Sequence, residues 1–117
     1  RTPDGSIKEF QRGAFLLIKR GMAPVIPAAI EGAHDAWPSG RPKPKLRGRI
    51  MVKFGEPIPA DVLIEMGPEQ ALQHVRGIIE GMRLELRAKI RKASGGRYPA
   101  AGPGDDDCRL ADGGAQA

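Results

Sequence analysis

The chain has few of the residues that build disulfides, thiolate metal sites and base-stacking surfaces. Cys108 is the only cysteine among 117 residues, which excludes an internal disulfide and a cysteine metal cluster. Five aromatic residues, three Phe, one Trp and one Tyr, are few for a nucleic-acid surface, because such surfaces usually stack bases on aromatic rings. The other residues of the kinds that bind metals are scattered along the chain. We therefore expect no metal site and no nucleic-acid partner.

Long apolar runs are also lacking. No run of about 18 apolar residues occurs, so the sequence predicts no transmembrane helix. The chain begins at Arg1 without a methionine and enters at once the turn-forming segment Thr-Pro-Asp-Gly. We expect it to be the C-terminal part of a longer protein, and its length allows one domain at most.

Positive charge is abundant and unevenly placed. The net charge is +5, and residues 94–117 hold two arginines and four aspartates, which leaves +7 for residues 1–93. Residues 41–53 contain six lysines and arginines and no acid, directly after Trp37. Such a stretch favours an anionic partner, such as phospholipid headgroups, a coenzyme A phosphate or nucleic acid, or else forms a solvated basic face. With Trp37 beside it, an anionic membrane surface is one expected partner.

Apolar spacing predicts a helix over residues 10–20 and a strand over residues 25–30. The apolar residues of the helix form one stripe: Phe10, Ala14, Leu17 and Ile18. Gly21 fits the left-handed position after a helix. The strand has no polar alternation, which predicts burial on both faces, and Pro27 marks an edge, a bulge or a strand end within it.

The second half predicts a loop over 31–45, a strand over 49–54 and a helix that starts at Gly67-Pro68 and stops at Gly95. The strand alternates, with Ile50, Val52 and Phe54 on one side and Arg49, Met51 and Lys53 on a wet or headgroup-facing side. Phe10, Phe15 and Phe54 are expected in or near the core. Residues 1–93 therefore predict part of an α/β domain, and residues 94–117 a disordered tail rich in Gly, Pro and Asp.

Four short segments follow one another in a recognisable order. They are Arg1-Thr2, Phe10-Gln11-Arg12-Gly13-Ala14, Val25-Ile26-Pro27-Ala28-Ala29-Ile30 and Phe54-Gly55-Glu56-Pro57-Ile58. Their order resembles the C-terminal half of the 1-acyl-sn-glycerol-3-phosphate acyltransferase (lysophosphatidic acid acyltransferase) family, with Gln11 where that family commonly has lysine. The resemblance covers roughly half of the chain and implies a mixed sheet flanked by helices.

The family resemblance implies transfer of an acyl chain from acyl-CoA or acyl carrier protein to the hydroxyl of lysophosphatidic acid, giving phosphatidic acid. It also implies a location at the cytoplasmic face of the cell membrane. It implies no resident cofactor, since the acyl-CoA or acyl carrier protein thioester is a co-substrate. Two alternatives remain. In the first, a member of the same family acylates glycerol 3-phosphate or another lysolipid. In the second, the chain is a non-catalytic basic module that binds anionic lipid or nucleic acid.

The family's catalytic element is His-x4-Asp, in which the histidine is the general base and the aspartate orients its ring. The fifth residue after His34 is Ser39, and the fifth after His74 is Ile79. We therefore expect the catalytic pair upstream of Arg1, no catalytic residue in this chain, and no activity of the chain alone. His74 is expected to face solvent.

Two arginines are candidates for binding the acceptor phosphate. By the resemblance, Arg1 belongs to the segment that holds this phosphate, for which a guanidinium is suited because it can bind phosphate oxygens bidentately. Arg12 lies in the first turn of the predicted helix, where backbone N–H groups favour anions. Arg12 is alternatively an ordinary surface charge.

Overall fold

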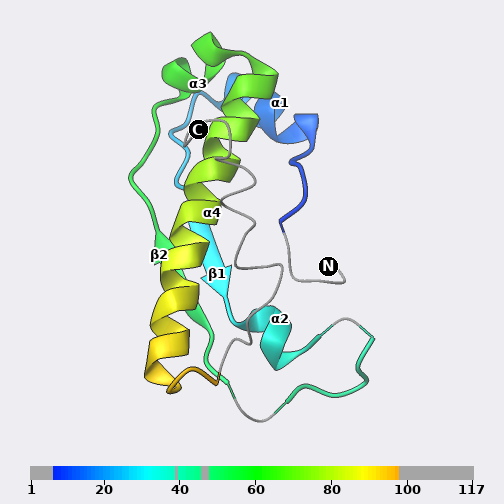
Figure 1. The fold of residues 1–117 in the computed structure, drawn as a ribbon. Coiled ribbons are helices and arrows are strands. Elements are labelled where there is room, and N and C mark those ends of the chain that lie inside the picture. The colour runs from blue at the N-terminus through cyan, green and yellow to red at the C-terminus, as the bar shows by residue number, and fades with distance from the viewer. Residues whose placement is uncertain (1–6, 39, 46–47, 98–117) are drawn as a thin grey trace.

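The computed structural model describes residues 7–38, 40–45 and 48–97. In these residues the chain forms a small mixed α/β fold whose two strands pair antiparallel, and the expected combination of helices and strands is confirmed. The elements are α1 (Arg12–Gly21), β1 (Ala28–Glu31), α2 (Ala33–Ala36), β2 (Met51–Phe54), α3 (Ala60–Met66) and α4 (Pro68–Ala93). Figure 1 shows α4 running along the molecule, with α1 and α3 at one end and α2 toward the other.

Helix α4 has the start and stop signals that the sequence predicts. Pro68 occupies the first turn, where its missing N–H costs no hydrogen bond, and Glu69 follows at the positive end of the helix dipole. Ser94 N closes the helix by donating to Ile90 O at 3.0 Å. The sequence places Leu72, Val75, Ile78, Ile79, Met82, Leu86 and Ile90 at helical spacing. Val75, Met82, Leu86 and Ile90 are buried together with Ala71, and the other three are partly buried, so this apolar stripe is confirmed in part.

One core cluster joins the first half of α4 to α1 and α3. Its buried members are Phe15, Ile58, Leu63, Ala71 and Val75. The predicted stripe of α1 is wrong in part, because Leu17 is 73% exposed and Phe15 is the buried residue. The helix also ends differently from the expectation. Gly21 is its last residue, and Met22 takes the left-handed conformation with φ 48°.

Pro27 divides the predicted strand into two separately paired pieces. Before it, Val25 and Ile58 exchange backbone hydrogen bonds of 2.8 and 2.7 Å. After it, β1 begins at Ala28 and pairs with β2. Of the edge, bulge or strand end predicted at Pro27, the structure shows an interruption of the strand, and it follows from the missing N–H. The expectation of burial on both faces is wrong for the described residues, because Ala28 and Ile30 are exposed while Ala29 and Glu31 are buried.

The orientation predicted for the second strand is wrong. Val52 and Phe54 are exposed, whereas Met51 packs against the cluster of Ala29, Met82 and Leu86. Phe54, expected in the core, is 70% exposed. The reason lies in α4, which offers apolar side chains to Met51.

Lys53 lies on the same side of β2 as Met51 because alternate residues of a strand share a face, and α4 offers it an acidic partner there. Its ammonium group donates a hydrogen bond to Glu85. This hydrogen bond, together with the charge of Lys53, lowers the pKa of the Glu85 carboxyl. The lysine that was expected to face water or headgroups therefore faces the helix.

Two short helices, α2 and α3, were not predicted. Helix α2 lies within the predicted loop 31–45, and α3 lies between the predicted strand and the predicted long helix. Helix α2 follows Gly32, whose φ of 97° requires glycine. A Cβ at Gly32 would lie 1.9 Å from Arg49 O, so the backbone of 49 passes directly against this turn. Of the predicted tail 94–117, residues 94–96 form a turn after α4 and 98–117 lie outside the described residues, as does Arg1.

Candidate functional site

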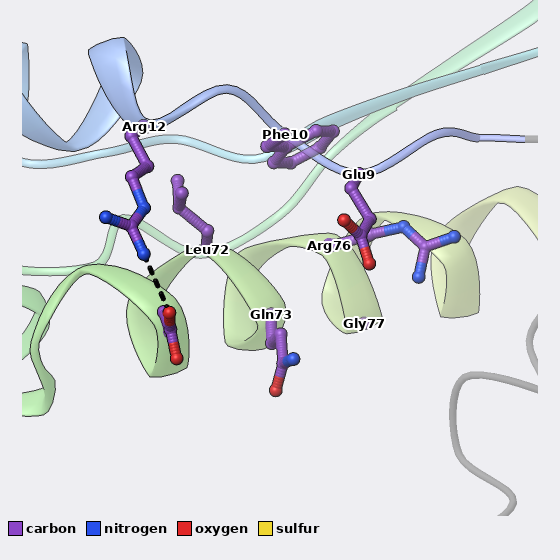
Figure 2. A pocket seen from close by; sticks show the side chains of 8 residues that line it. Glu9, Phe10, Arg12, Leu72, Gln73, Arg76 and Gly77 are labelled. Carbon is purple, nitrogen blue, oxygen red and sulfur yellow. Dashed lines mark hydrogen bonds and ion pairs between the residues drawn. The ribbon is translucent and has the colours of Figure 1, made fainter.

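Arg12 lies in a groove between the segment that precedes α1 and the first half of α4. The groove has a volume of about 570 Å³ and is lined by Glu9, Phe10, Arg12, Glu69, Leu72, Gln73, Arg76 and Gly77. In Figure 2 the Arg12 side chain reaches from the start of α1 toward α4, and the dashed line marks its ion pair with Glu69. The contact is 2.8 Å long.

The charges of this groove compensate one another. Arg12 and Glu69 are both 75% exposed, and an exposed pair of this kind contributes less than about 1 kcal/mol. Arg76 Nη2 donates to Ile7 O at 2.6 Å and also lies 2.9 Å from Glu80 Oε1. A phosphate at Arg12 would therefore have only a weak surface ion pair to replace, whereas Arg76 is held in place.

A second charged group joins the end of β1 to α4. Arg83 Nη1 donates to Glu31 Oε2 at 3.0 Å, and Arg87 Nη1 donates to Glu31 Oε1 at 3.3 Å. Asp35 Oδ2 lies 3.9 Å from Arg87 Nη1. We call Glu31, Asp35, Arg83 and Arg87 the charge cluster. Its two cations and two anions balance, so its evident role is to fasten β1 and α2 to α4.

An apolar hollow of about 530 Å³ adjoins the charge cluster. It is lined by Ile30, Glu31, Gly32, Ala33, His34, Ala36, Trp37, Pro44, Ile50 and Arg83. His34 is partly buried at this hollow, and the adjacent Asp35 is held toward Arg87. His74 is exposed on α4, as expected. The structure therefore places the two histidines at separate locations and gives neither an aspartate at the spacing of the family element.

The sequence interpretation missed the buried charges of α4, although a signal was present. Arg76, Glu80, Arg83 and Arg87 are spaced by four, three and four residues, which places them on one face of a helix. Glu80, Arg83 and Arg87 are buried in the structure. A charged stripe at this spacing beside an apolar stripe indicates paired internal charges, and Glu31 after an apolar strand was the complementary signal.

Within the described residues, no group of His, Cys, Asp or Glu side chains is placed to hold a metal ion. No helix in the same part of the chain combines the length and apolar composition that a membrane span requires. In comparisons with known proteins, no family model, no curated protein and no solved structure matches the chain.

Proposed function

We propose that this chain is part of a glycerolipid acyltransferase that moves an acyl chain from acyl-CoA or acyl carrier protein to lysophosphatidic acid, giving phosphatidic acid. The chain contributes scaffold and phosphate-binding arginines. The catalytic histidine and aspartate come from residues outside 1–117, and the reaction takes place at the cytoplasmic face of the cell membrane. The reaction needs no resident cofactor, since the thioester donor is a co-substrate.

The observation that carries the proposal is that three of the four family-like segments meet at one core cluster. Phe10, Val25 and Ile58 come from three different segments, and Phe10 and Val25 pack against the cluster that contains Ile58. Residues far apart in the sequence but similar to one family are thus neighbours in the fold. This is what we expect if the resemblance reflects a common structure.

The glycine and proline of two segments also fit each other. Gly55 N donates to Pro27 O at 2.8 Å. A Cβ at Gly55 would lie 2.9 Å from Pro27 Cγ and 3.2 Å from Met82 Sδ. The close approach favours glycine opposite this proline, because any side chain at residue 55 would push the turn that follows β2 away from Pro27. The two family-like features therefore support each other physically.

Arg12 is the described candidate for contact with the acceptor phosphate. Its partner Glu69 is exposed and is bound only by a surface ion pair, so a dianionic phosphate can replace it. The first turn of α1 holds no acidic residue, so the carboxylates that a phosphate at Arg12 would meet in this groove are Glu9 and Glu69. Arg1 would complete the site by the resemblance and lies outside the described residues.

The test begins with the codons that precede Arg1 in the source genome. We expect an open frame that ends in Glu-Gly-Thr and contains His-x4-Asp some tens of residues earlier. The protein so extended should form phosphatidic acid from lysophosphatidic acid and labelled acyl-CoA, and Arg1→Ala should lower kcat/KM by roughly 10- to 100-fold through lost charged hydrogen bonds. Arg20→Ala, at the opposite end of α1, is the matched control and should change nothing.

Three results would contradict the proposal. A stop codon directly before Arg1 would leave the chain without its base and favour a binding module. Acyl transfer by the 117-residue chain alone would show that the base lies within it. An extended protein that acylates neither lysophosphatidic acid, glycerol 3-phosphate nor another lysolipid would reject acyl transfer altogether.

A further inference from the structure

The outward face of the two-stranded sheet is apolar and exposed. Its residues are Ala28 and Ile30 of β1 and Val52 and Phe54 of β2, which we call the outer face. The ladder places Ala28 opposite Phe54 and Ile30 opposite Val52, so the four side chains share one surface. All four are exposed. An apolar surface of this kind on a folded chain marks a binding surface.

The outer face adjoins the apolar hollow at the end of the sheet. Ile30, Trp37, Pro44 and Ile50 line one hollow, and Ile30 also belongs to the outer face. Trp37 is 42% exposed, and its Nε1 donates to Arg41 O at 2.8 Å. The tryptophan thus presents an apolar ring at the surface while its polar nitrogen is satisfied, which suits an interface between apolar and aqueous phases.

Four exposed cations lie along the loop at this end of the sheet, and we call them the basic border: Arg41, Lys43, Lys45 and Arg49. The loop is held against α2 because Lys45 N donates to Ala36 O at 2.6 Å, and the Trp37 hydrogen bond holds the backbone carbonyl of Arg41 beside the indole. Residues 41–53 contain no acid. The loop that borders the apolar surface therefore carries positive charge and no negative charge.

We propose that the outer face and its basic border bind an anionic phospholipid bilayer, with Trp37 at the level of the headgroups. A bilayer complements both features at once, because lipid tails accept the apolar side chains and anionic headgroups attract the cations. The inference extends the proposed function, since a lysophospholipid acceptor is itself a membrane lipid, but its test needs no acyl transfer. If the vesicle test fails, the proposed acyl transfer is not contradicted, and if acyl transfer fails, membrane binding is not contradicted.

The test uses the 117-residue chain and vesicles of either pure phosphatidylcholine or phosphatidylcholine with 30% phosphatidylglycerol. The readouts are cosedimentation and the fluorescence of Trp37, the only tryptophan of the chain. We expect binding to the anionic vesicles with a blue-shifted emission, weaker binding to the neutral vesicles, and a decline with salt as screening increases. No cosedimentation with the anionic vesicles would overturn the proposal.

Two pairs of variants separate charge at the border from charge in general. Lys43→Gln with Lys45→Gln should weaken anionic binding by roughly 30-fold, since each cation near the surface contributes about a fivefold effect. Lys19→Gln with Arg20→Gln removes the same charge from the exposed end of α1 and should have little effect. Equal losses in both pairs would mean that net charge alone drives binding, which would overturn the assigned surface.

The apolar part needs its own comparison. Ile30→Thr with Phe54→Thr should lower binding to anionic vesicles at least tenfold and abolish the blue shift, whereas Leu17→Thr on α1, also exposed, should not. Unchanged binding of the outer-face pair would overturn the proposal. A dimer seen by light scattering and lost in this pair would instead assign the face to a second copy. In an extended protein, vesicle binding that no longer depends on this pair would show that other residues cover the face, which would also overturn the proposal.

Discussion

The two faces of the sheet differ in polarity in an unexpected way: the face that packs inward carries charged residues, whereas the face exposed to solvent is apolar. The inner face, against α4, carries Ala29, Glu31, Met51 and Lys53, and the outer face carries only apolar residues. The inner face accepts charge because α4 supplies partners for both Glu31 and Lys53. Which side of a strand packs inward therefore depends on the groups that the neighbouring element offers to it, as well as on hydropathy.

The inner face depends on charge pairing that cannot be removed from one side alone. A buried carboxylate and a buried guanidinium have both lost their water, and their attraction offsets that loss only while both are present. The outer face has no such dependence, since its residues already contact solvent. Variants on the two faces should therefore differ strongly. Three changes on the sheet test this difference, and a fourth tests the turn at Gly32 that follows β1.

The largest effect is expected from Glu31→Gln. The change removes the carboxylate that Arg83 and Arg87 share and should lower the free energy of unfolding by about 3–5 kcal/mol. Urea denaturation followed by circular dichroism measures it. The control is Glu69→Gln, which breaks an exposed pair with Arg12 and should cost less than about 1 kcal/mol. Similar losses in both variants would show that the inner face is not a buried charge site.

Gly32→Ala should follow, with a loss of about 3 kcal/mol. Its φ of 97° is unfavourable for alanine, and the added Cβ would meet Arg49 O at 1.9 Å. The matched control is Gly40→Ala, which has a φ of 88° but nothing within 4 Å of the added Cβ, and should cost about 1 kcal/mol. Thermal unfolding distinguishes the two, and equal costs would argue against the close approach of residue 49.

Phe54→Thr should change the stability by less than about 0.5 kcal/mol, because the ring is largely exposed and threonine favours strands. Leu86→Ala, at a buried residue that packs on the inner face, should cost about 2–5 kcal/mol by leaving a cavity. Chemical denaturation of both proteins makes the comparison. A large loss on Phe54→Thr would mean that the outer face is covered in solution.

The smallest effect concerns the pKa of Glu85. Lys53→Gln removes the hydrogen bond and the charge that lower this pKa, so an NMR titration should show it rising toward its ordinary value. The stabilisation by this pair is present above the unfolded pKa of Glu85 and is lost as the pH falls through its lowered folded pKa. The variant should therefore be less stable at neutral pH and equal to the parent in acid. Lys89→Gln, a weaker contributor, should raise the pKa less.

Local signals predicted the long helix and the break at Pro27 because each has a local physical cause. A proline at the first position of α4 and the repeated apolar spacing are visible without knowledge of any neighbour. The faces of the strands were not predictable in this way. Lys53 packs inward only because Glu85 lies opposite it, more than 30 residues later in the sequence.

The candidate site was predictable only in part. Arg12 was identified as a candidate for phosphate binding, and its pairing with Glu69 depends on how α1 lies against the start of α4, which no local pattern specifies. The charge cluster required the combination of Glu31, after a strand, with a charged stripe on a distant helix. Contacts between distant segments are what a single sequence leaves undetermined.

The central position of α4 has a consequence for how the chain is made. The core clusters and the charge cluster all draw on α4, which is the last of the described elements in the sequence. During translation, the earlier helices and strands leave the ribosome before their packing partner exists. At ordinary synthesis rates the 26 residues of α4 take about one to five seconds to appear. For that interval the nascent chain exposes its future core, and it is then most open to chaperones and proteases.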